Sequence, residues 1–259
     1  MPPDLLFTMP LVGMFFTLLL TVGLIALALH LLFAWKPVRR ASEHLADLSP
    51  VTMTLCGTVF GLSVAFLANS VWAMEDRARE TVNAEARSIR VMQVYVSAMT
   101  ASTQDSFARI LQGYGQAVAR EWDDMADMGP SADAESRLRH LYAAVLRGFS
   151  EGEQNRAVQQ RLLTALDSLS TARQQRLSIA QDVVSIGQWF LVTALGLLLL
   201  VVIAIGHARF PVPRTVALAS MTMAITIALY VIAAHDRPFI GPAAQSPWPI
   251  LDATGVASE

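Results

Sequence analysis

The side chains that could do chemistry in this sequence are few and scattered. Cys56 is the single cysteine, and the five histidines are at positions 30, 44, 140, 207 and 235. None of them has the spacing of a metal-ligand motif such as HExxH or of a Cys/His cluster. Gly61 and Ser63 are spaced as in the Gly-x-Ser motif of membrane serine proteases, but no glycine follows the serine, and no histidine lies well within another apolar segment to act as its base. The sequence therefore predicts no enzyme activity, no cofactor and no metal site.

Hydroxyl groups alternate with bulky apolar groups along one stripe of the apolar segment 51–74. At about 100° per residue, this stripe contains Phe60, Ser63, Leu67, Ser70 and Met74. Polar groups in hydrocarbon are costly unless they are paired or wet, and apolar rings can gate a pore by dewetting. One interpretation is a pore lined by this stripe, with Phe60 and Leu67 as constrictions. The other is plain packing, since a serine can donate to the carbonyl four residues back.

Two further faces of the same segment differ from this stripe. The first is a stripe of small residues that favours close helix packing, formed by Gly57, Gly61, Val64 and Ala68. The other contains Leu62, Phe66, Asn69 and Ala73. Because Ser63 and Asn69 lie on opposite sides, one polar face can line an aqueous path while the other must find a partner in protein.

Dense charge follows the segment directly, beginning with Glu75, Asp76, Arg77 and Arg79. A Glu-to-Arg pair four residues apart, such as Glu75 with Arg79, steadies a solvated helix by a few tenths of a kcal/mol. A self-paired, solvated face is one interpretation. If several copies surround an axis, the same residues form a charged ring at a pore mouth and concentrate one sign of ion.

The elements that carry these residues are membrane helices. The chain is 54% hydrophobic and only 15% charged, and four segments reach the roughly 20 apolar residues that span a bilayer: 11–35, 51–74, 183–206 and 212–234. None of the four contains Asp, Glu or Lys, and Arg214 is at an edge. Ion-coupled transport is disfavoured, because acidic residues within the spans usually mark it.

Residues 75–182 have helical periodicity throughout and predict a bundle of four amphipathic helices. Their charge is nearly balanced, with 13 Arg against 15 Asp and Glu, which argues against a nucleic-acid partner. Turn signals occur at 128–133, with Ser131 or Asp133 as N-cap, and at 148–153. No such signal separates the bundle from the second or the third span, so both spans are expected to continue into it as long helices, the first about 70 Å long.

The expected organisation is therefore two spans in residues 1–74, the bundle in 75–182, two spans in 183–234, and a proline-rich tail in 235–259. The tail is expected to form no helix beyond Asp236 and to be disordered from residue 252. Asp236 and Arg237 are candidate partners for Arg79 or Glu75. The two short loops are basic, with Lys36, Arg39, Arg40, Arg209 and Arg214, which places them in the cytoplasm and the bundle outside.

Motifs at both ends of the bundle resemble a bacterial membrane family called bestrophin-like. The residues that carry the resemblance are Trp72, Ala78, Arg79, Val82, Glu85, Ala86, Asp236, Pro238, Phe239 and Gly241, together with "RQQRLS" at 173–178. The resemblance implies a ring-shaped homo-oligomer, a pentamer, in the bacterial inner (cytoplasmic) membrane. It also implies anion conduction along an axis lined by the second span, and a bundle in the cytosol, opposite to the side that loop charge indicates.

The sequence thus predicts an all-α membrane protein with four spans, an inserted helical bundle and a symmetric homo-oligomeric assembly. Its predicted function is a gated channel for inorganic anions, because the hydroxyl and amide donors of the second span are joined by no carboxylate. The partners are the lipid bilayer and further copies of the chain. The alternative is a membrane-anchored sensor or scaffold whose bundle binds a partner.

Overall fold

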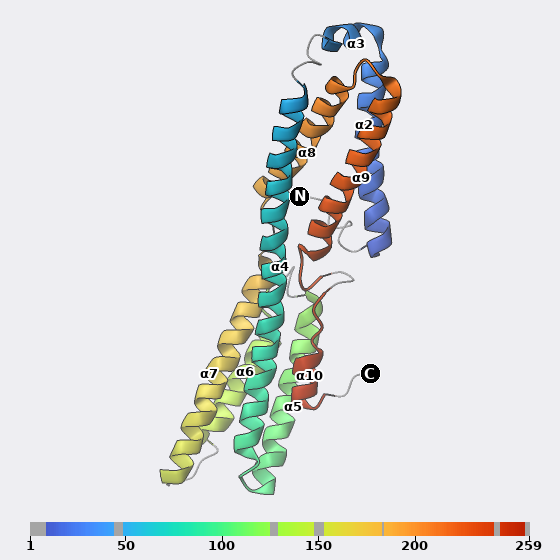
Figure 1. Cartoon of the computed structure of the whole chain (residues 1–259). Coiled ribbons are helices and arrows are strands. Elements are labelled where there is room, and N and C mark those ends of the chain that lie inside the picture. The colour runs from blue at the N-terminus through green and yellow to red at the C-terminus, as the bar shows by residue number, and fades with distance from the viewer. Residues whose placement is uncertain are drawn as a thin grey trace. The chain divides into compact units, whose positions relative to one another are not determined.

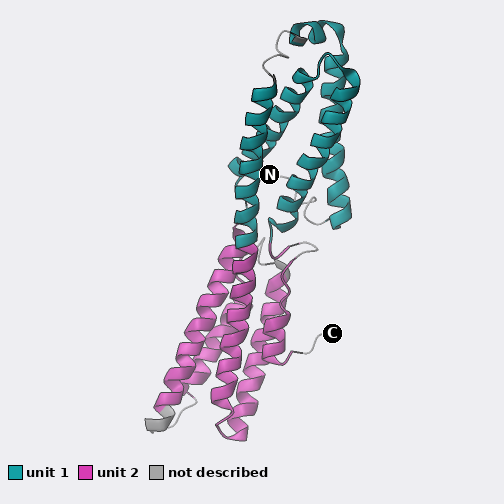
Figure 2. Ribbon diagram, in the orientation of Figure 1, with its two compact units in different colours: residues 1–73, 184–237, 241–243 teal, residues 74–183, 238–240, 244–259 magenta. Residues whose placement is uncertain are grey.

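The computed structural model describes residues 9–43, 49–124, 129–147, 153–182, 184–240 and 244–256 of the 259-residue chain. Every regular element within these ranges is a helix (Figure 1). The chain divides into two compact units (Figure 2). Unit 1 comprises residues 1–73, 184–237 and 241–243, and unit 2 comprises residues 74–183, 238–240 and 244–259. Both units are therefore assembled from segments that lie far apart in the sequence.

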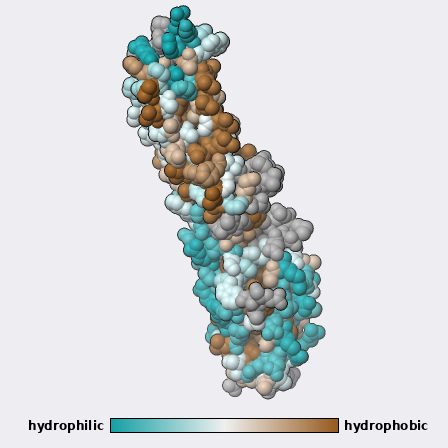
Figure 3. Space-filling view, turned by 90° about the vertical axis from the view of Figure 1, so that its right-hand side faces the viewer, coloured by the Kyte–Doolittle hydropathy of each residue, from teal (hydrophilic) through white to brown (hydrophobic). Residues whose placement is uncertain are grey.

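Unit 1 is built from helices long and apolar enough to cross a membrane. They are α2 (Leu11–Ala34), the first half of α4 (Ser49–Val96), α8 (Ile186–Gly206) and α9 (Pro211–His235), and the short α3 (Lys36–Glu43) follows α2. Hydrophobic side chains cover much of the surface of unit 1, whereas hydrophilic ones cover unit 2 (Figure 3). The chain is an all-α, multi-pass membrane protein, and the four predicted spans are confirmed.

The core of unit 1 is formed by residues of α2, α4, α8 and α9. Phe60 and Leu67 of α4 pack there with Leu199 of α8 and Ile225 of α9. A Cβ atom added to Gly196 of α8 would lie 3.4 Å from the Phe60 ring and 3.6 Å from Ile225. An added Cβ here would therefore make ordinary van der Waals contacts, so α8 packs against both neighbours at normal contact distance.

Unit 2 is a bundle of the second half of α4 with α5 (Ala101–Asp124), α6 (Ala132–Arg147) and α7 (Glu153–Gln181). The predicted apolar faces are confirmed in its core, which includes Val82, Ile89, Met92, Leu111, Val118, Leu138, Leu141, Leu162, Leu166 and Leu169. Ser131 directly precedes α6, as expected of an N-cap, and its carbonyl accepts the Glu135 N–H at 3.0 Å. Most of the turn predicted at 148–153 lies outside the described residues.

The predicted continuity of the last bundle helix with the third span is wrong. Helix α7 ends at Gln181, and α8 begins at Ile186 with Ser185 as its N-cap. The Ser185 hydroxyl accepts the Gln188 N–H, while Gln188 Oε1 accepts the Ser185 N–H at 3.0 Å. This capping box satisfies backbone donors at a new helix start, so a continuous rod is replaced by a break. Among the helices in the described ranges, only α4, with 48 residues or about 72 Å at 1.5 Å per residue, has residues in both units.

The prediction of a tail without helix is also wrong. Residues 238–240 and 244–259 belong to unit 2, and Trp248–Thr254 forms the helix α10. Pro247 is the N-cap of α10 and Pro249 lies in its first turn. Neither proline has an N–H that a helix start would leave unsatisfied, and Gly255 ends the helix at φ 70°. Ile250 and Ala253 are buried in the bundle core. The expected disorder therefore does not begin at residue 252, since apolar burial stabilises this segment.

Candidate pore helix and buried charge network

The predicted pore stripe of α4 is split between the core and the surface of unit 1. Phe60 and Leu67 are only 7% and 4% exposed, because they pack against α8 and α9. Ser63 is half-buried, and its hydroxyl donates to the Val59 carbonyl at 2.8 Å. Ser70 is exposed and Met74 half-buried. The burial of Phe60 and Leu67 disagrees with their predicted role as constrictions, since a side chain within the protomer core offers little surface to a pore.

The face of α4 that points away from this core is the one that contains Asn69. Leu62, Phe66 and Asn69 are all exposed, Leu62 by 55% and Phe66 by 68%. In the part of the chain that the structure describes, the Asn69 amide has no hydrogen-bond partner. Only 11% of the membrane window of α4 is buried, against 39% in α8 and in α9. The least covered span therefore presents a polar amide outward.

Of the small residues predicted for helix packing, Val64 packs against the unit 1 core, whereas Gly57 and Gly61 meet no other helix within the protomer. A Cβ atom added to Gly57 or Gly61 would have no atom within 4 Å, and Ala68 is half-buried. An added Cβ at Gly196 of α8, by contrast, would contact both Phe60 and Ile225. The stripe of Gly57 and Gly61 stays available to a second chain.

The charges that follow the α4 span are partly self-paired. Arg79 Nη2 lies 3.0 Å from Glu75 Oε1, and Arg79 Nη1 lies 3.9 Å from Asp76 Oδ1. Gln245 of the tail also donates to Glu75 at 3.5 Å. This pairing along one exposed helix face agrees with the solvated interpretation at the level of a single chain. Arg77 points elsewhere, into a cavity described below.

A buried network of charges ties the helices of unit 2 together. Arg176 Nε of α7 lies 2.9 Å from Glu85 Oε2 of α4, and both side chains are fully buried. The Tyr114 hydroxyl of α5 donates to Glu85 Oε1 at 2.6 Å. Arg176 also reaches Glu121 of α5 at 3.2 Å. One guanidinium thus compensates carboxylates from two helices.

A second arginine of α7 extends this network to α6. Arg173 forms a salt bridge with Glu121, and its Nη1 lies 2.9 Å from Glu135 Oε2. The Ser131 N–H donates to Glu121 Oε1 at 2.8 Å, so the same carboxylate also holds the start of α6. Four helices therefore share one set of charge-assisted hydrogen bonds, which are stronger and more directional than neutral ones.

The protonation states in the network follow from this compensation. Burial alone would lower the pKa of the Arg176 guanidinium, but the negative charge and hydrogen bonds of Glu85 raise it above its ordinary value. Burial raises the pKa of the Tyr114 phenol well above its ordinary value, and the neighbouring Glu85 charge raises it further. Arg176 therefore stays charged, and Tyr114 keeps the proton that it donates.

The motif residues after the last span act as anchors. The Phe239 ring packs edge-on against Trp122 of α5, with centroids 5.5 Å apart, and the Arg176 guanidinium lies 4.8 Å from the centre of the Trp122 ring. The Trp122 indole N–H donates to the Gln245 carbonyl at 3.0 Å, and the buried Pro238 accepts the Gln245 N–H at 2.7 Å. The tail thus docks directly beside the buried charges of unit 2.

Asp236 has a different partner from the one predicted. Its buried Oδ1 accepts the Val184 N–H at 2.8 Å, within unit 1. Burial raises the pKa of this carboxyl, although the hydrogen bond from Val184 opposes the shift. Asp236 therefore stabilises the non-helical segment between α7 and α8 rather than pairing with Arg79. Trp72 is 51% exposed, and Gly241 lies outside the described residues.

The sequence contained a signal for the network that the apolar pattern alone missed. On α7, Arg173 and Arg176 continue the three- and four-residue spacing of Leu162, Leu166 and Leu169. On α4, Glu85 falls between Val82 and Ile89 in the same way. Charged residues at core positions of two helices, opposite in sign, predict a buried pair, because an isolated buried charge is very costly.

A buried arginine in unit 1 was missed as well. Arg214 of α9 is 2% exposed, and its Nη1 donates to the Phe33 carbonyl at 2.9 Å and to the Ala208 carbonyl at 3.4 Å. These carbonyls belong to the ends of other segments, where the backbone has acceptors to satisfy. Arg214 therefore joins the end of α2 to the start of α9 instead of extending from a loop.

Four membrane-length helices joined to a hydrophilic helical bundle through one continuous helix define a multi-pass membrane protein of a distinctive class. The chain belongs to the bestrophin-like family, since the bestrophin-like domain matches residues 9–250. This membership confirms the family that the sequence predicted.

Solved structures show the same fold. A bacterial bestrophin homologue from Klebsiella pneumoniae superposes with a TM-score of 0.69 and 14% identity, covering 94% of this chain and 99% of that chain. A single-substitution variant of that homologue gives a TM-score of 0.71 with 11% identity, covering 93% and 97%. At such identities the likeness is one of fold. No curated protein sequence matches the chain.

Proposed function

We propose that several copies of this chain form a gated ion channel whose pore is lined by the membrane half of α4. The observation that carries the proposal is the exposed Asn69 on the least covered span. Moving an amide without a hydrogen-bond partner from water into hydrocarbon costs about 2–7 kcal/mol. A water-filled axis, or a neighbouring copy, removes that cost.

The pore face that we propose consists of Leu62, Phe66 and Asn69, with Ser70 at its edge. Leu62 and Phe66 are four residues apart and exposed, so in a ring of chains they form successive apolar constrictions. Asn69 lies about one turn further along and supplies a polar ring. This choice replaces the stripe of Phe60 and Leu67, whose side chains fill the protomer core.

Support for self-association comes from the small residues of α4. Gly57 and Gly61 have no neighbour within 4 Å of an added Cβ, which is the surface that a second α4 needs for close approach. A ring of five copies follows the family resemblance, as does a bacterial inner membrane location. The Klebsiella pneumoniae protein of the same fold is described as a bestrophin homologue.

Anions are the ions that we propose to permeate. The α4 span offers hydroxyl and amide donors, and no Asp or Glu occurs between residues 50 and 74. Donors without carboxylates stabilise an anion that has lost part of its hydration shell. The side of the membrane that the bundle occupies does not enter this proposal.

The test is current through purified protein in planar bilayers under a chloride gradient. We expect the reversal potential to follow chloride, Asn69→Leu to lower the conductance, and Leu62→Ala with Phe66→Ala to raise it. Thr21→Val on the exposed face of α2 is a matched control and should change nothing, because its hydroxyl is satisfied by Thr17.

Two results would contradict parts of the proposal. If Ser63→Ala and Leu67→Ala change the conductance while Asn69→Leu does not, the pore is lined by the stripe predicted from the sequence, which contains Ser63 and Leu67. If no current appears under any gradient, the sensor or scaffold function takes the place of the channel.

A further inference from the structure

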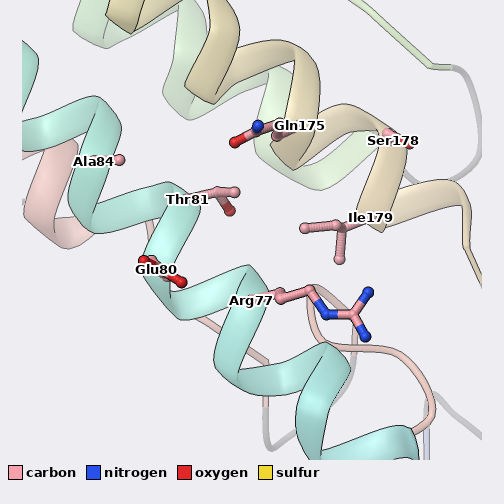
Figure 4. Close-up of a pocket in the computed structure, with 7 residues that line it drawn as sticks. All are labelled: Arg77, Glu80, Thr81, Ala84, Gln175, Ser178 and Ile179. Atoms are coloured by element: carbon pink, nitrogen blue, oxygen red, sulfur yellow. The ribbon is translucent and has the colours of Figure 1, made fainter.

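Unit 2 has an open cavity between α4 and α7 that the channel proposal does not use (Figure 4). Its volume is about 490 Å³, and it is lined by Arg77, Glu80, Thr81, Ala84, Gln175, Ser178 and Ile179. Residues of α4 form one wall and residues of α7 the other. The size is typical of small-molecule sites, which occupy about 300–1,000 Å³.

The cavity has two opposite charges that do not neutralise each other. Arg77 and Glu80 are three residues apart on α4, a spacing at which ion pairs commonly form. Within the described ranges, neither side chain has an ion-pair or hydrogen-bond partner. Figure 4 shows the Arg77 guanidinium directed away from Glu80. The neighbouring Arg79 behaves differently, since it pairs with Glu75 at 3.0 Å.

Neutral groups complete the lining between the two charges. The Thr81 hydroxyl donates to the Ala78 carbonyl at 2.8 Å, so its oxygen keeps an acceptor site toward the cavity. Among the described residues, the side chains of Gln175 and Ser178 have no hydrogen-bond partner, and both can donate as well as accept. Ala84 and Ile179 supply apolar surface. A ligand here meets a cation at one end, an anion at the other, and adaptable polar groups in the middle.

The geometry points to a binding site for a small zwitterion that carries a phosphate or carboxylate near a primary ammonium group, and we propose phosphoethanolamine as its chemistry. Arg77 binds the anionic group by charge-assisted hydrogen bonds. Glu80 accepts from the ammonium. Glu80 would repel a purely anionic ligand, and Arg77 would repel a purely cationic one.

The same chemistry is available from a phospholipid headgroup or from a free solute. On α4, Arg77 follows Met74, the last apolar residue of the span, by three residues, or about 4.5 Å of helix rise. The headgroup layer of a bilayer is about 5–7 Å thick on each side. Arg77 is therefore at the level where a lipid phosphate lies, and arginines at this level attract phosphate.

Native mass spectrometry of the full-length protein tests the proposal by counting bound phosphatidylethanolamine and phosphatidylglycerol supplied in equal amounts. We expect phosphatidylethanolamine to be retained at least fivefold better by the unmodified protein. Glu80→Gln should abolish this preference, since it removes the ammonium partner. Arg77→Gln should weaken retention of both lipids.

The charge-exchanged double variant, R77E with E80R, separates a ligand site from a structural effect. It restores both charges in reversed order. Phosphatidylethanolamine retention should therefore be higher in the double variant than in R77E alone or E80R alone. Arg139→Gln on α6 is the matched control, because Arg139 is exposed and lies outside the cavity. Its lipid preference should equal that of the unmodified protein.

A second arm identifies the source of the ligand. Soluble glycerophosphoethanolamine, titrated calorimetrically into protein in detergent, binds through Arg77 and Glu80 if a free zwitterion suffices, and the two variants abolish the heat. If only the lipid arm responds, the ligand is a headgroup. If neither arm depends on Arg77 and Glu80, the proposal is overturned, whether or not the protein conducts ions.

Discussion

Arg176 Nε lies 2.9 Å from Glu85 Oε2, and both side chains are fully buried. This pair joins α7 to α4, whose first half belongs to the membrane unit. A buried ion pair adds little net stability, because the cost of removing both ions from water offsets their attraction. Loss of one ion, however, leaves the other buried and uncompensated. The pair therefore matters most for holding α4 and α7 in one register.

Glu85→Ala should destabilise unit 2 by about 3–5 kcal/mol, because it leaves the Arg176 charge buried without its main partner. The measurement is the free energy of unfolding from chemical denaturation in detergent. Arg90→Ala breaks the exposed pair with Asp252 and should cost less than about 1 kcal/mol. The interpretation is wrong if the two variants are equally stable. Glu85→Leu combined with Arg176→Met should be more stable than Glu85→Ala, since no charge remains buried.

Gly115→Ala should displace the tail helix α10 from α5. A Cβ atom at Gly115 would collide with the Thr254 hydroxyl and lie 2.8 Å from Thr254 Cβ. We expect faster hydrogen exchange and proteolysis in residues 248–256. At Gly113 the nearest atom is the flexible end of Arg137, 3.2 Å away, so Gly113→Ala is the control. Thr254→Gly removes the two nearest atoms and leaves Val256 Cγ2 at 3.0 Å, so it should rescue Gly115→Ala in large part. No rescue at all would show that the collision is not the cause.

Ser185→Ala should lower the free energy of unfolding by about 1 kcal/mol, since it removes the side-chain acceptor of the α8 capping box. Ser185→Thr keeps the acceptor and should recover most of that stability. Ser168→Ala provides the comparison, because within the described ranges the Ser168 hydroxyl bonds only to the Thr164 carbonyl of its own helix. Equal unfolding free energies for the Ser168 and Ser185 variants would contradict the assigned cap.

Tyr142 should make unit 2 lose stability between about pH 10 and 12. Burial and the hydrogen bond to Asp167, 2.9 Å long, raise the pKa of Tyr142 to about 12, above its ordinary value of 10.0. Between these values the folded state holds a proton that the unfolded state has lost, so stability is complete below pH 10 and declines as the pH rises. The difference in tyrosinate absorbance between the unmodified protein and Tyr142→Phe should show one group titrating near pH 12. Titration of that group near pH 10 would contradict the assignment.

The sequence predicted the parts of this fold that depend on local patterns. Span length and uniform apolarity predicted four membrane helices, and three- and four-residue spacing predicted the buried faces of the bundle, such as Val82 with Ile89. It also contained the capping box of Ser185 and Gln188 and the core-register charges Glu85 and Arg176. These signals required the polar residues to be examined with the same periodicity as the apolar ones.

Amino-acid order by itself determined which segments enter the membrane, which are helical and which helix faces are apolar. Only the tertiary structure decided that Phe60 and Leu67 face the protomer core, that Arg176 compensates Glu85, and that the tail returns to Trp122. The physical reason is range: helix periodicity acts between residues three or four apart. These choices depend instead on contacts between residues 91 to 136 positions apart, such as Glu85 with Arg176 and Phe60 beside Gly196. Such contacts form only when whole helices pack.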